Sequence, residues 1–461
     1  MRLEPDVDDA SVTAVQAPSP LRREDLHASV SDPVLDTMNF LNEVTLRHPE
    51  AISFAPGRPY DGFFDTEQLF GYLRRYLDHL AETGRSPAEV RSALFQYGPT
   101  AGRIREVIAE SLRQDEGIDV PPESIVVTVG CQEAMFLAVR VLIAAPQDVL
   151  LVSSPCYVGI TGAARVLGVG LSPVEEGENG FDCAVLEAVV AAERAAGRRP
   201  RALYVIPDHS NPLGTTMPLE TRRELLDLAA RLDLLILEDS PYRLVSPGPQ
   251  LPSLKALDTR RSVVQLGSFS KTLFPGARVG YAVADQVVAD RSGATGLLAD
   301  ELTRIKSMVT VNTSPLSQAV VAGMLLAAGG RATEHNVQTS AYYGEAMAAT
   351  LRELGKAFPP DRRADLGIRW NCPDGGFFLS LTVPFRADNA ALARSVRDHG
   401  VIWTPMSYFH PDGGGTRALR LSTSYLTHDE IVEGIARLAR FVEAEVEVEA
   451  GTNGADDTAR P

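Results

Sequence analysis

Short apolar runs alternate with segments of helical spacing between about residue 65 and residue 330. Helical spacing is clearest in residues 65–84 and 101–118, where Asp65 and Gly84 are expected to cap and to end the first helix. The apolar runs that predict strands are "SIVVTVG", "DVLLVSSPCY", "RALYVIPDHSNPLG", "LDLLILEDSPY" and "RSVVQLGSFSK". Buried strands separated by helices predict a mostly parallel sheet flanked by helices, and hence an α/β fold.

The last three of these runs end in polar, loop-like clusters. In mostly parallel sheets, ligands bind beyond the carboxyl ends of the strands. The clusters are therefore expected to converge on one ligand site.

The pattern changes after about residue 330, where a long helix precedes shorter strands and a final helix, as in a smaller α+β domain. The expected termini are a disordered N-terminal arm (1–30) and a disordered tail (447–461). Between them we expect a large domain with the main sheet (76–330) and a small domain built from an N-terminal part (31–75) and a C-terminal part (331–446).

Charge and composition narrow the classes of partner. The 461 residues include 44 Lys and Arg against 60 Asp and Glu, and the net charge of -16 argues against nucleic-acid binding. No apolar run reaches the roughly 18 residues of a membrane helix, and the N-terminus lacks the apolar region of a secretory signal. The four cysteines share no metal-type spacing, so we expect no metal site and reduced thiols in a cytoplasmic protein.

The stretch "SFSKTLFPGARVGY" contains a lysine in an unusual setting. Lys271 follows Ser268 and Ser270, and Arg278 comes seven residues later. Two hydroxyl groups and a guanidinium form a typical phosphate-binding set, and a lysine with a lowered pKa is a nucleophile. Together they indicate a phosphorylated aldehyde, pyridoxal 5'-phosphate. The alternative is a surface lysine beside a structural arginine.

Two further clusters offer partners for the ring of such a cofactor. Asp239 ends an apolar strand and could face a pyridinium N–H, with Tyr242 three residues later as a donor to the 3-oxygen. Asn211, held before Pro212, could donate to the same oxygen. The alternatives are an aspartate that caps a turn and an ordinary Asn-Pro turn.

The remaining candidates are less specific. In "TVGCQEA", Gly130 allows close approach to a helix N-terminus, where Cys131 and Gln132 could bind phosphate. Tyr157 could stack on the ring, and Tyr97 in "YGPTAG" could donate to phosphate. Arg420 lies in an apolar strand pattern and needs an anion, either a substrate carboxylate or a protein acid.

In this combination and order, the motifs resemble the class I/II aminotransferases of the fold-type I pyridoxal-phosphate enzymes. The match runs from "ISFAPGRP" to "ALRLSTSYL" and is densest in "FQYGPTAG", "LEDSPY" and "GSFSKTLFPGARVGY". It is similar above all to the branch of aminoadipate, kynurenine and aromatic aminotransferases. The resemblance implies a homodimer that moves an amino group between an L-amino acid and a 2-oxo acid by a ping-pong mechanism.

The resemblance also implies roles for single residues. Lys271 would hold the cofactor as an imine and then move the α-proton, while Asp239 pairs with the ring nitrogen and Tyr157 stacks on the ring. Asn211 and Tyr242 would hold the 3-oxygen. Arg420 would bind the substrate α-carboxylate, assisted by Asn211 and the backbone of Gly57. The residues implied at the phosphate are Cys131, Gln132, Ser268, Ser270, Arg278 and, from the neighbouring subunit, Tyr97.

The chain departs from the family pattern at five positions. Cys131 stands where Ser or Thr is usual, and Ser240 where a second Asp is common. His209, Ser210 and Met406 also differ and are expected to border the substrate space.

Two other functions remain open. A lyase, decarboxylase or oxidative deaminase would use the same cofactor but break a different bond. A ligand-sensing transcriptional regulator would need a basic N-terminal module, whereas about 30 acidic, Pro-containing residues precede the fold here. Arg58 could favour a second carboxylate on the substrate, but the sequence does not decide this.

Overall fold

The computed structural model describes residues 21–457, except for residues 33, 36, 38, 39, 41, 42, 44, 45, 178 and 179. Its larger sheet has seven strands in the order β2-β8-β7-β6-β5-β3-β4. Their bounds are Ile125–Val129 (β2), Asp148–Ser154 (β3), Gly170–Glu175 (β4), Arg199–Val205 (β5), Leu235–Asp239 (β6), Val263–Ser268 (β7) and Val279–Val283 (β8). All run parallel except β8, which is antiparallel to both neighbours. The expected mostly parallel sheet is confirmed.

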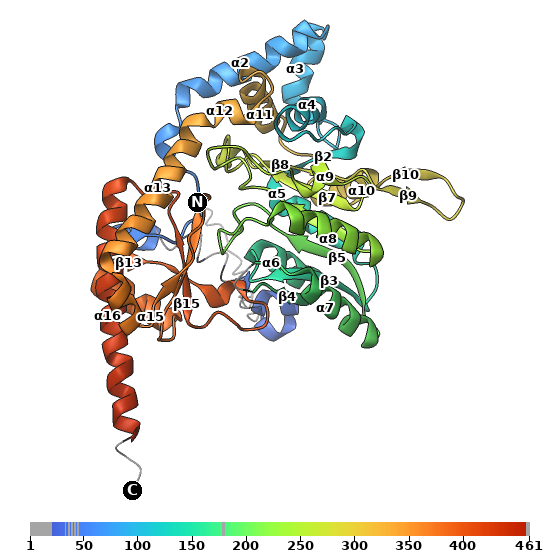
Figure 1. Ribbon diagram of the computed structural model, residues 1–461. Coiled ribbons are helices and arrows are strands. Elements are labelled where there is room, and N and C mark those ends of the chain that lie inside the picture. Colours follow the sequence, from blue (N-terminus) through green and yellow to red (C-terminus); the bar gives the residue numbers. More distant parts are fainter. Residues whose placement is uncertain are drawn as a thin grey trace, which may run out of the picture.

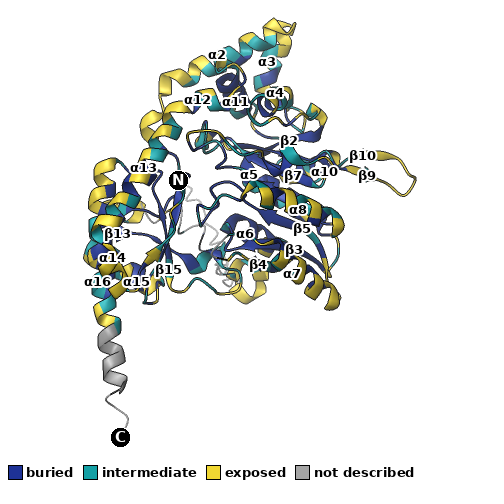
Figure 2. Ribbon diagram, in the orientation of Figure 1, coloured by how far each residue is buried: buried dark blue, intermediate teal, exposed yellow. Residues whose placement is uncertain are grey.

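Helices pack on both faces of this sheet, because successive strand residues point to opposite sides. In β3, Leu150 and Val152 belong to one apolar core and Leu151 to another. Strand residues are buried while the helices show exposed outer faces (Figure 2). The helices of this region are α5 (Gly130–Leu142), α6 (Val158–Leu167), α7 (Cys183–Ala195), α8 (Leu219–Arg231), α9 (Leu254–Leu257) and α10 (Leu298–Val309). A hairpin of β9 (Val287–Ala289) and β10 (Thr295–Leu297) projects from it (Figure 1).

The smaller sheet is antiparallel and lies beside the large domain (Figure 1). Its strands are β11 (Arg369–Trp370), β12 (Phe378–Thr382), β15 (Ala418–Ser422) and β14 (Thr404–Pro405). Helices α13 (Val337–Ala357), α14 (Pro360–Asp365), α15 (Asn389–Arg394) and α16 (His428–Asp457) belong to this region. Strand β1 (Ile52–Ser53) pairs with β13 (Val401–Ile402), which ties the segment before the large sheet to the small domain, as expected.

A group of helices stands at one end of the large sheet, at the top of Figure 1. It comprises α2 (Thr66–Glu82), α3 (Pro87–Phe95), α4 (Arg105–Glu116), α11 (Pro315–Ala327) and α12 (Ala332–His335). Asp65 accepts a hydrogen bond from the Glu67 N–H, so its expected N-cap role in α2 is confirmed. The periodicity did not predict α3, although its N-terminus carries a capping box of Ser86 and Glu89 with Pro87 at the first position.

The expected domain boundary at residue 75 falls inside α2. This helix packs tightly on α11, since a Cβ on Gly323 would lie 1.8 Å from the Tyr72 carbonyl oxygen. Backbone contact of this kind joins α2 to the large domain. We therefore propose that the large domain begins before Thr66.

The terminal segments also differ from expectation. Residues 1–20 and 458–461 lie outside the described residues. Residues 23–25 and 28–31 form short 3-10 helices, although all of them except Ser31 were expected in a disordered arm. Helix α16 continues through residue 447 to Asp457, so a disordered tail from 447 is wrong for that stretch. In the described part of the chain, no helix is long and apolar enough to cross a membrane.

Candidate active site

A cavity of about 280 Å³ opens at the carboxyl ends of the large-sheet strands, beside the small domain. All candidate site residues except Tyr97 line it, including Gly57 from the N-terminal segment and Arg420 from β15. The convergence of the polar clusters is thereby confirmed. The residues from the candidate set are Gly57, Cys131, Gln132, Tyr157, Asn211, Asp239, Tyr242, Ser268, Ser270, Lys271, Arg278 and Arg420. Tyr97 lies outside the cavity and is 84% exposed.

One end of the cavity is built for an anion. Gly130, with φ of +69°, begins α5, and a Cβ there would lie 2.6 Å from Arg278 Nη2. The Ser268 and Ser270 hydroxyl groups are 2.8 Å apart. Within the described residues, the Arg278 guanidinium has no hydrogen-bond acceptor. Free N–H groups at the start of α5, two hydroxyl groups and this guanidinium together suit a phosphate.

Asp239, at the end of β6, is buried with both carboxylate oxygens engaged. Tyr204 Oη donates to Oδ2 at 2.6 Å, and the Cys131 thiol donates to Oδ1 at 3.2 Å. Burial raises the pKa of Asp239 to about 6, opposed by these two donors and by the charge of Lys271. A cationic N–H from a bound ring would stabilise the ionised form. Tyr204 was not predicted, because an apolar strand made it look like a packing residue.

Cys131 differs in part from its expected role. Its thiol donates a hydrogen bond to Asp239, whereas the expected role was to donate to a phosphate, as a Ser or Thr hydroxyl would. Burial, followed by the Asp239 charge, raises the pKa of the thiol far above its usual range, so it stays a donor. Its position in the first turn of α5 leaves the backbone N–H for an anion.

Lys271 follows β7, and its Nζ donates to the Gly57 carbonyl at 2.6 Å. Burial lowers the pKa of Lys271 to about 8, with further lowering by the charges of Arg278 and Arg420. Asp239 acts in the opposite direction. Since only the neutral amine is a nucleophile, this environment increases the fraction of reactive Lys271 near neutral pH.

A chain of hydrogen bonds crosses the cavity wall from Tyr242 to Arg420. Asn211 Nδ2 donates to Tyr242 Oη at 3.3 Å, and Arg420 Nη1 donates to Asn211 Oδ1 at 2.9 Å. Arg420 also donates to the Ala55 carbonyl, and it faces the rings of Phe378 and Phe409. Burial lowers its pKa to about 10. A substrate carboxylate would compensate this desolvated cation.

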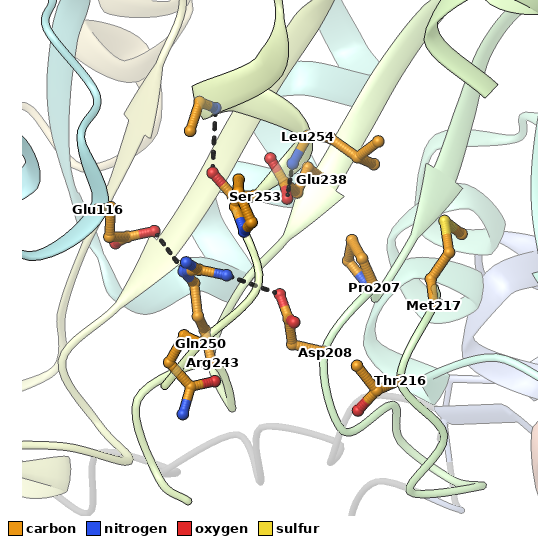
Figure 3. Close-up of polar contacts among 12 residues, drawn as sticks. Glu116, Pro207, Asp208, Thr216, Met217, Glu238, Arg243, Gln250, Ser253 and Leu254 are labelled. Carbon is orange, nitrogen blue, oxygen red and sulfur yellow. Dashed lines mark hydrogen bonds and ion pairs between the residues drawn. The ribbon is translucent and has the colours of Figure 1, made fainter. Parts of the chain in front are cut away.

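A buried ion-pair network holds the two segments that carry Asn211 and Tyr242 (Figure 3). Asp208 accepts from Arg243 Nη1 at 3.3 Å, and Arg243 Nε lies 3.0 Å from Glu116 Oε2 at the end of α4. Arg222 Nη2 also donates to Asp208, at 2.5 Å. Because Asp208 is three residues before Asn211 and Arg243 directly follows Tyr242, the network fixes both turns.

Replacing Arg243 by methionine is expected to destabilise the fold by about 3–5 kcal/mol, because the buried Glu116 carboxylate then loses its cation. Burial already raises the pKa of Glu116, and the variant raises it further, so the deficit should shrink as pH falls and the group becomes protonated. Denaturant midpoints of wild type and variant at pH 8 and pH 5 measure both effects.

The matched control is Arg260→Met, whose 3.7 Å ion pair with Asp227 is exposed and contributes little. Equal midpoint shifts for the two variants would show that the buried network does not stabilise this region.

His209, Ser210 and Met406 do not line the cavity, so the expectation that they border the substrate space is wrong for this site. His209 is buried and lies 3.7 Å from Asp374, and Ser210 Oγ is 2.8 Å from Thr215 Oγ1. Met406 packs on Val158 and Phe409. All three side chains therefore contact protein groups outside the cavity. Ser240 does not line it either.

Comparison with known proteins gives a consistent result. A model of the family "Aminotransferase class I and II" matches residues 71–438. The chain is 46% identical over 427 residues to the (S)-3,5-dihydroxyphenylglycine transaminase of Amycolatopsis orientalis, covering 92% of this chain and 95% of that relative. It is 32% identical over 410 residues to the 2-aminoadipate transaminase of Thermus thermophilus, covering 88% and 93%.

The solved structures include the kynurenine aminotransferase of Pyrococcus horikoshii in complex with PMP, with kynurenine as substrate. It is 27% identical to this chain, and the TM-score is 0.75. The alignment covers 92% of this chain and 97% of that one.

Proposed function

Since this chain belongs to the class I and II aminotransferase family and is a pyridoxal-phosphate-dependent aminotransferase of fold-type I, we propose that its amino-acid substrate carries an oxygen-bearing aromatic side chain, as in 3,5-dihydroxyphenylglycine. The name of the relative that is 46% identical over nearly its whole length supports this substrate class.

The convergence of Lys271, Asp239 and Arg420 in one cavity is the observation that carries the chemistry. The residues also fit the cofactor. Gly130 leaves room beside Arg278, whose guanidinium lacks a protein acceptor among the described residues, and Asp239 is a buried acid without a cationic N–H partner. When bound, pyridoxal phosphate supplies a reactive aldehyde and a protonated ring that accepts an electron pair.

Within this site we assign the following roles. Asp239 would pair with the ring nitrogen, Asn211 and Tyr242 would hold the 3-oxygen of the cofactor, and Tyr157 would cover the ring. Arg420 binds the α-carboxylate of the substrate and so presents the Cα–H bond to Lys271. The neutral Lys271 amine takes up the α-proton and later returns a proton to the product. The phosphate ligands are the α5 N-terminus with Cys131 N–H and Gln132, together with Ser268, Ser270 and Arg278.

A half-reaction assay tests this function. The protein loaded with pyridoxal phosphate is mixed with (S)-3,5-dihydroxyphenylglycine, (S)-phenylglycine, L-tyrosine, L-2-aminoadipate or L-norleucine, and the loss of the cofactor's visible band is followed. The highest kcat/KM is expected for the hydroxylated aromatic substrate, with a 2-oxo acid as product. Ammonia release without a 2-oxo acid acceptor would instead indicate a lyase or a deaminase, and a preference for norleucine would contradict the aromatic class.

A homodimer is supported by an exposed apolar surface around Tyr97. Phe95, Met308 and Leu316 are 79%, 85% and 54% exposed, and Asn312 donates to the Gly98 carbonyl, which brings the two segments together. A second copy would cover this surface and bring its Tyr97 to the phosphate end of the neighbouring cavity. A single-chain mass by light scattering would contradict the dimer.

A cytoplasmic location is supported by the four cysteines, all of which are free. Recovery of the protein only from a membrane or secreted fraction would contradict it.

A further inference from the structure

Arg58 lies at the edge of the reactive centre. It follows Gly57, whose carbonyl accepts the hydrogen bond from Lys271 Nζ, and its own carbonyl accepts from Ser424 Oγ at 2.8 Å. These contacts fix the backbone from both sides. The Arg58 side chain is half-buried and lines the same cavity as Lys271.

The guanidinium of Arg58 rests on an aromatic ring. Its central carbon is 3.8 Å from the centroid of the Tyr425 ring, and Tyr425 Oη donates to Asp61 Oδ2 at 3.3 Å, which steadies the ring. Stacking on a ring orients a planar guanidinium while leaving the N–H groups on its edge available.

Those N–H groups lack partners. Throughout the described residues, the Arg58 guanidinium makes no hydrogen bond or ion pair, and its Nε is buried. The buried Nε donor is removed from water without an acceptor, which costs free energy, so this guanidinium suits an acceptor from outside the chain.

The other cations of the cavity have different assignments. Lys271 donates to Gly57, and Arg420 donates to Asn211 and Ala55. Arg278 lies beside Gly130 at the phosphate end. Arg58 is the remaining arginine that lines the cavity, and it directly follows Gly57, whose carbonyl accepts the hydrogen bond from Lys271.

We propose that Arg58 determines substrate specificity by donating a hydrogen bond to an oxygen on the substrate side chain. This rests on the proposed function in one respect, the identification of that oxygen as a phenolic hydroxyl. Arginine has only hydrogen-bond donors, so it selects a substrate with an acceptor oxygen. When an analogue without that oxygen binds, the guanidinium stays unpaired. A carboxylate oxygen has the same acceptor chemistry, and the experiment separates the two.

The test compares Arg58→Met with Arg363→Met. Arg363 also stacks on an aromatic ring, with its central carbon 4.8 Å from the Trp370 centroid, but it lies outside the cavity. Arg58→Met is expected to lower kcat/KM for (S)-3,5-dihydroxyphenylglycine by at least about 30-fold and for (S)-phenylglycine by less than about 3-fold. Arg363→Met should change neither value. Arg58→Lys, which keeps the charge but not the planar fork, should recover only part of the loss.

A binding measurement provides a second readout. Calorimetry with 3,5-dihydroxyphenylacetate and phenylacetate, which carry no amino group to react, should show weaker binding to Arg58→Met for the hydroxylated acid only. Equal losses for the hydroxylated and plain compounds, in either experiment, would overturn the role of Arg58.

The design separates this inference from the proposed substrate. If wild type prefers L-2-aminoadipate, the aromatic substrate class fails. Arg58 then still determines specificity provided that Arg58→Met lowers kcat/KM for aminoadipate but not for L-norleucine, which lacks the second carboxylate. If the variant lowers both equally, the inference fails as well.

Discussion

Replacing Lys271 by alanine should lower turnover by about 10⁴-fold and remove the visible absorbance of the bound cofactor, because one amine both anchors the cofactor and moves the α-proton. Lys271→Arg should lose as much, since a guanidinium stays protonated and cannot act as a nucleophile. Stopped-flow absorbance and the cofactor content after dialysis measure both losses.

Lys356→Ala is the control, because Lys356 is exposed, pairs with Glu353 and does not line the cavity. Its kinetics and spectrum should match those of wild type. A Lys271→Ala protein that keeps its visible band and its turnover would refute the assignment of this cavity as the active site.

The same substitution has a pH signature in the cofactor-free protein. The pKa of Lys271 is about 8 in the fold, below its value of 10.5 in an unfolded chain, so the unfolded state binds more protons between these values. Stability therefore rises with pH across this window in wild type, relative to Lys271→Ala. Thermal melts from pH 7.5 to 10 should show the difference, and parallel curves would contradict the lowered pKa.

Replacing Arg420 by methionine should lower kcat/KM by about 10²–10⁴-fold, the usual effect of removing one partner of a buried charged contact. The effect on folding should be much smaller, because burial of this cation already lowers its pKa and methionine avoids its desolvation. Steady-state kinetics and thermal melts on the same samples separate the two effects.

The control for this variant is Arg417→Met, just before β15, whose 3.5 Å pair with Glu449 is exposed.

The role of Arg420 predicts a further result. Wild type should strongly prefer phenylglycine to benzylamine, which lacks the α-carboxylate, and Arg420→Met should lose most of that preference. A preference that survives intact would assign the carboxylate contact to another residue.

Several features of the site follow from local sequence patterns. Apolar runs that end in polar clusters predicted β5, β6 and β7, and parallel strands bring their carboxyl ends to one edge of the sheet. Asn211, Asp239 and Lys271 could thus be placed together without coordinates.

Other features depend on contacts between distant segments. Tyr204 and Cys131 both donate to Asp239. The apolar strand around Tyr204 did not predict this contact, and the position of Cys131 at a helix start predicted a phosphate ligand instead. Arg58 meets Tyr425 across most of the chain. Nothing in the local periodicity of either segment encodes such a pair.

By itself, the sequence determined the class of fold and the cofactor, and it predicted most of the polar residues that line the cavity, because periodicity, strand-end polarity and short motifs are local properties. The tertiary structure alone decided which oxygen of Asp239 each donor reaches, that α2 packs on α11, and that Arg58 lines the cavity with an unpaired Nε. Those outcomes depend on packing between segments far apart in the chain, where burial sets both the partners and the pKa of each group.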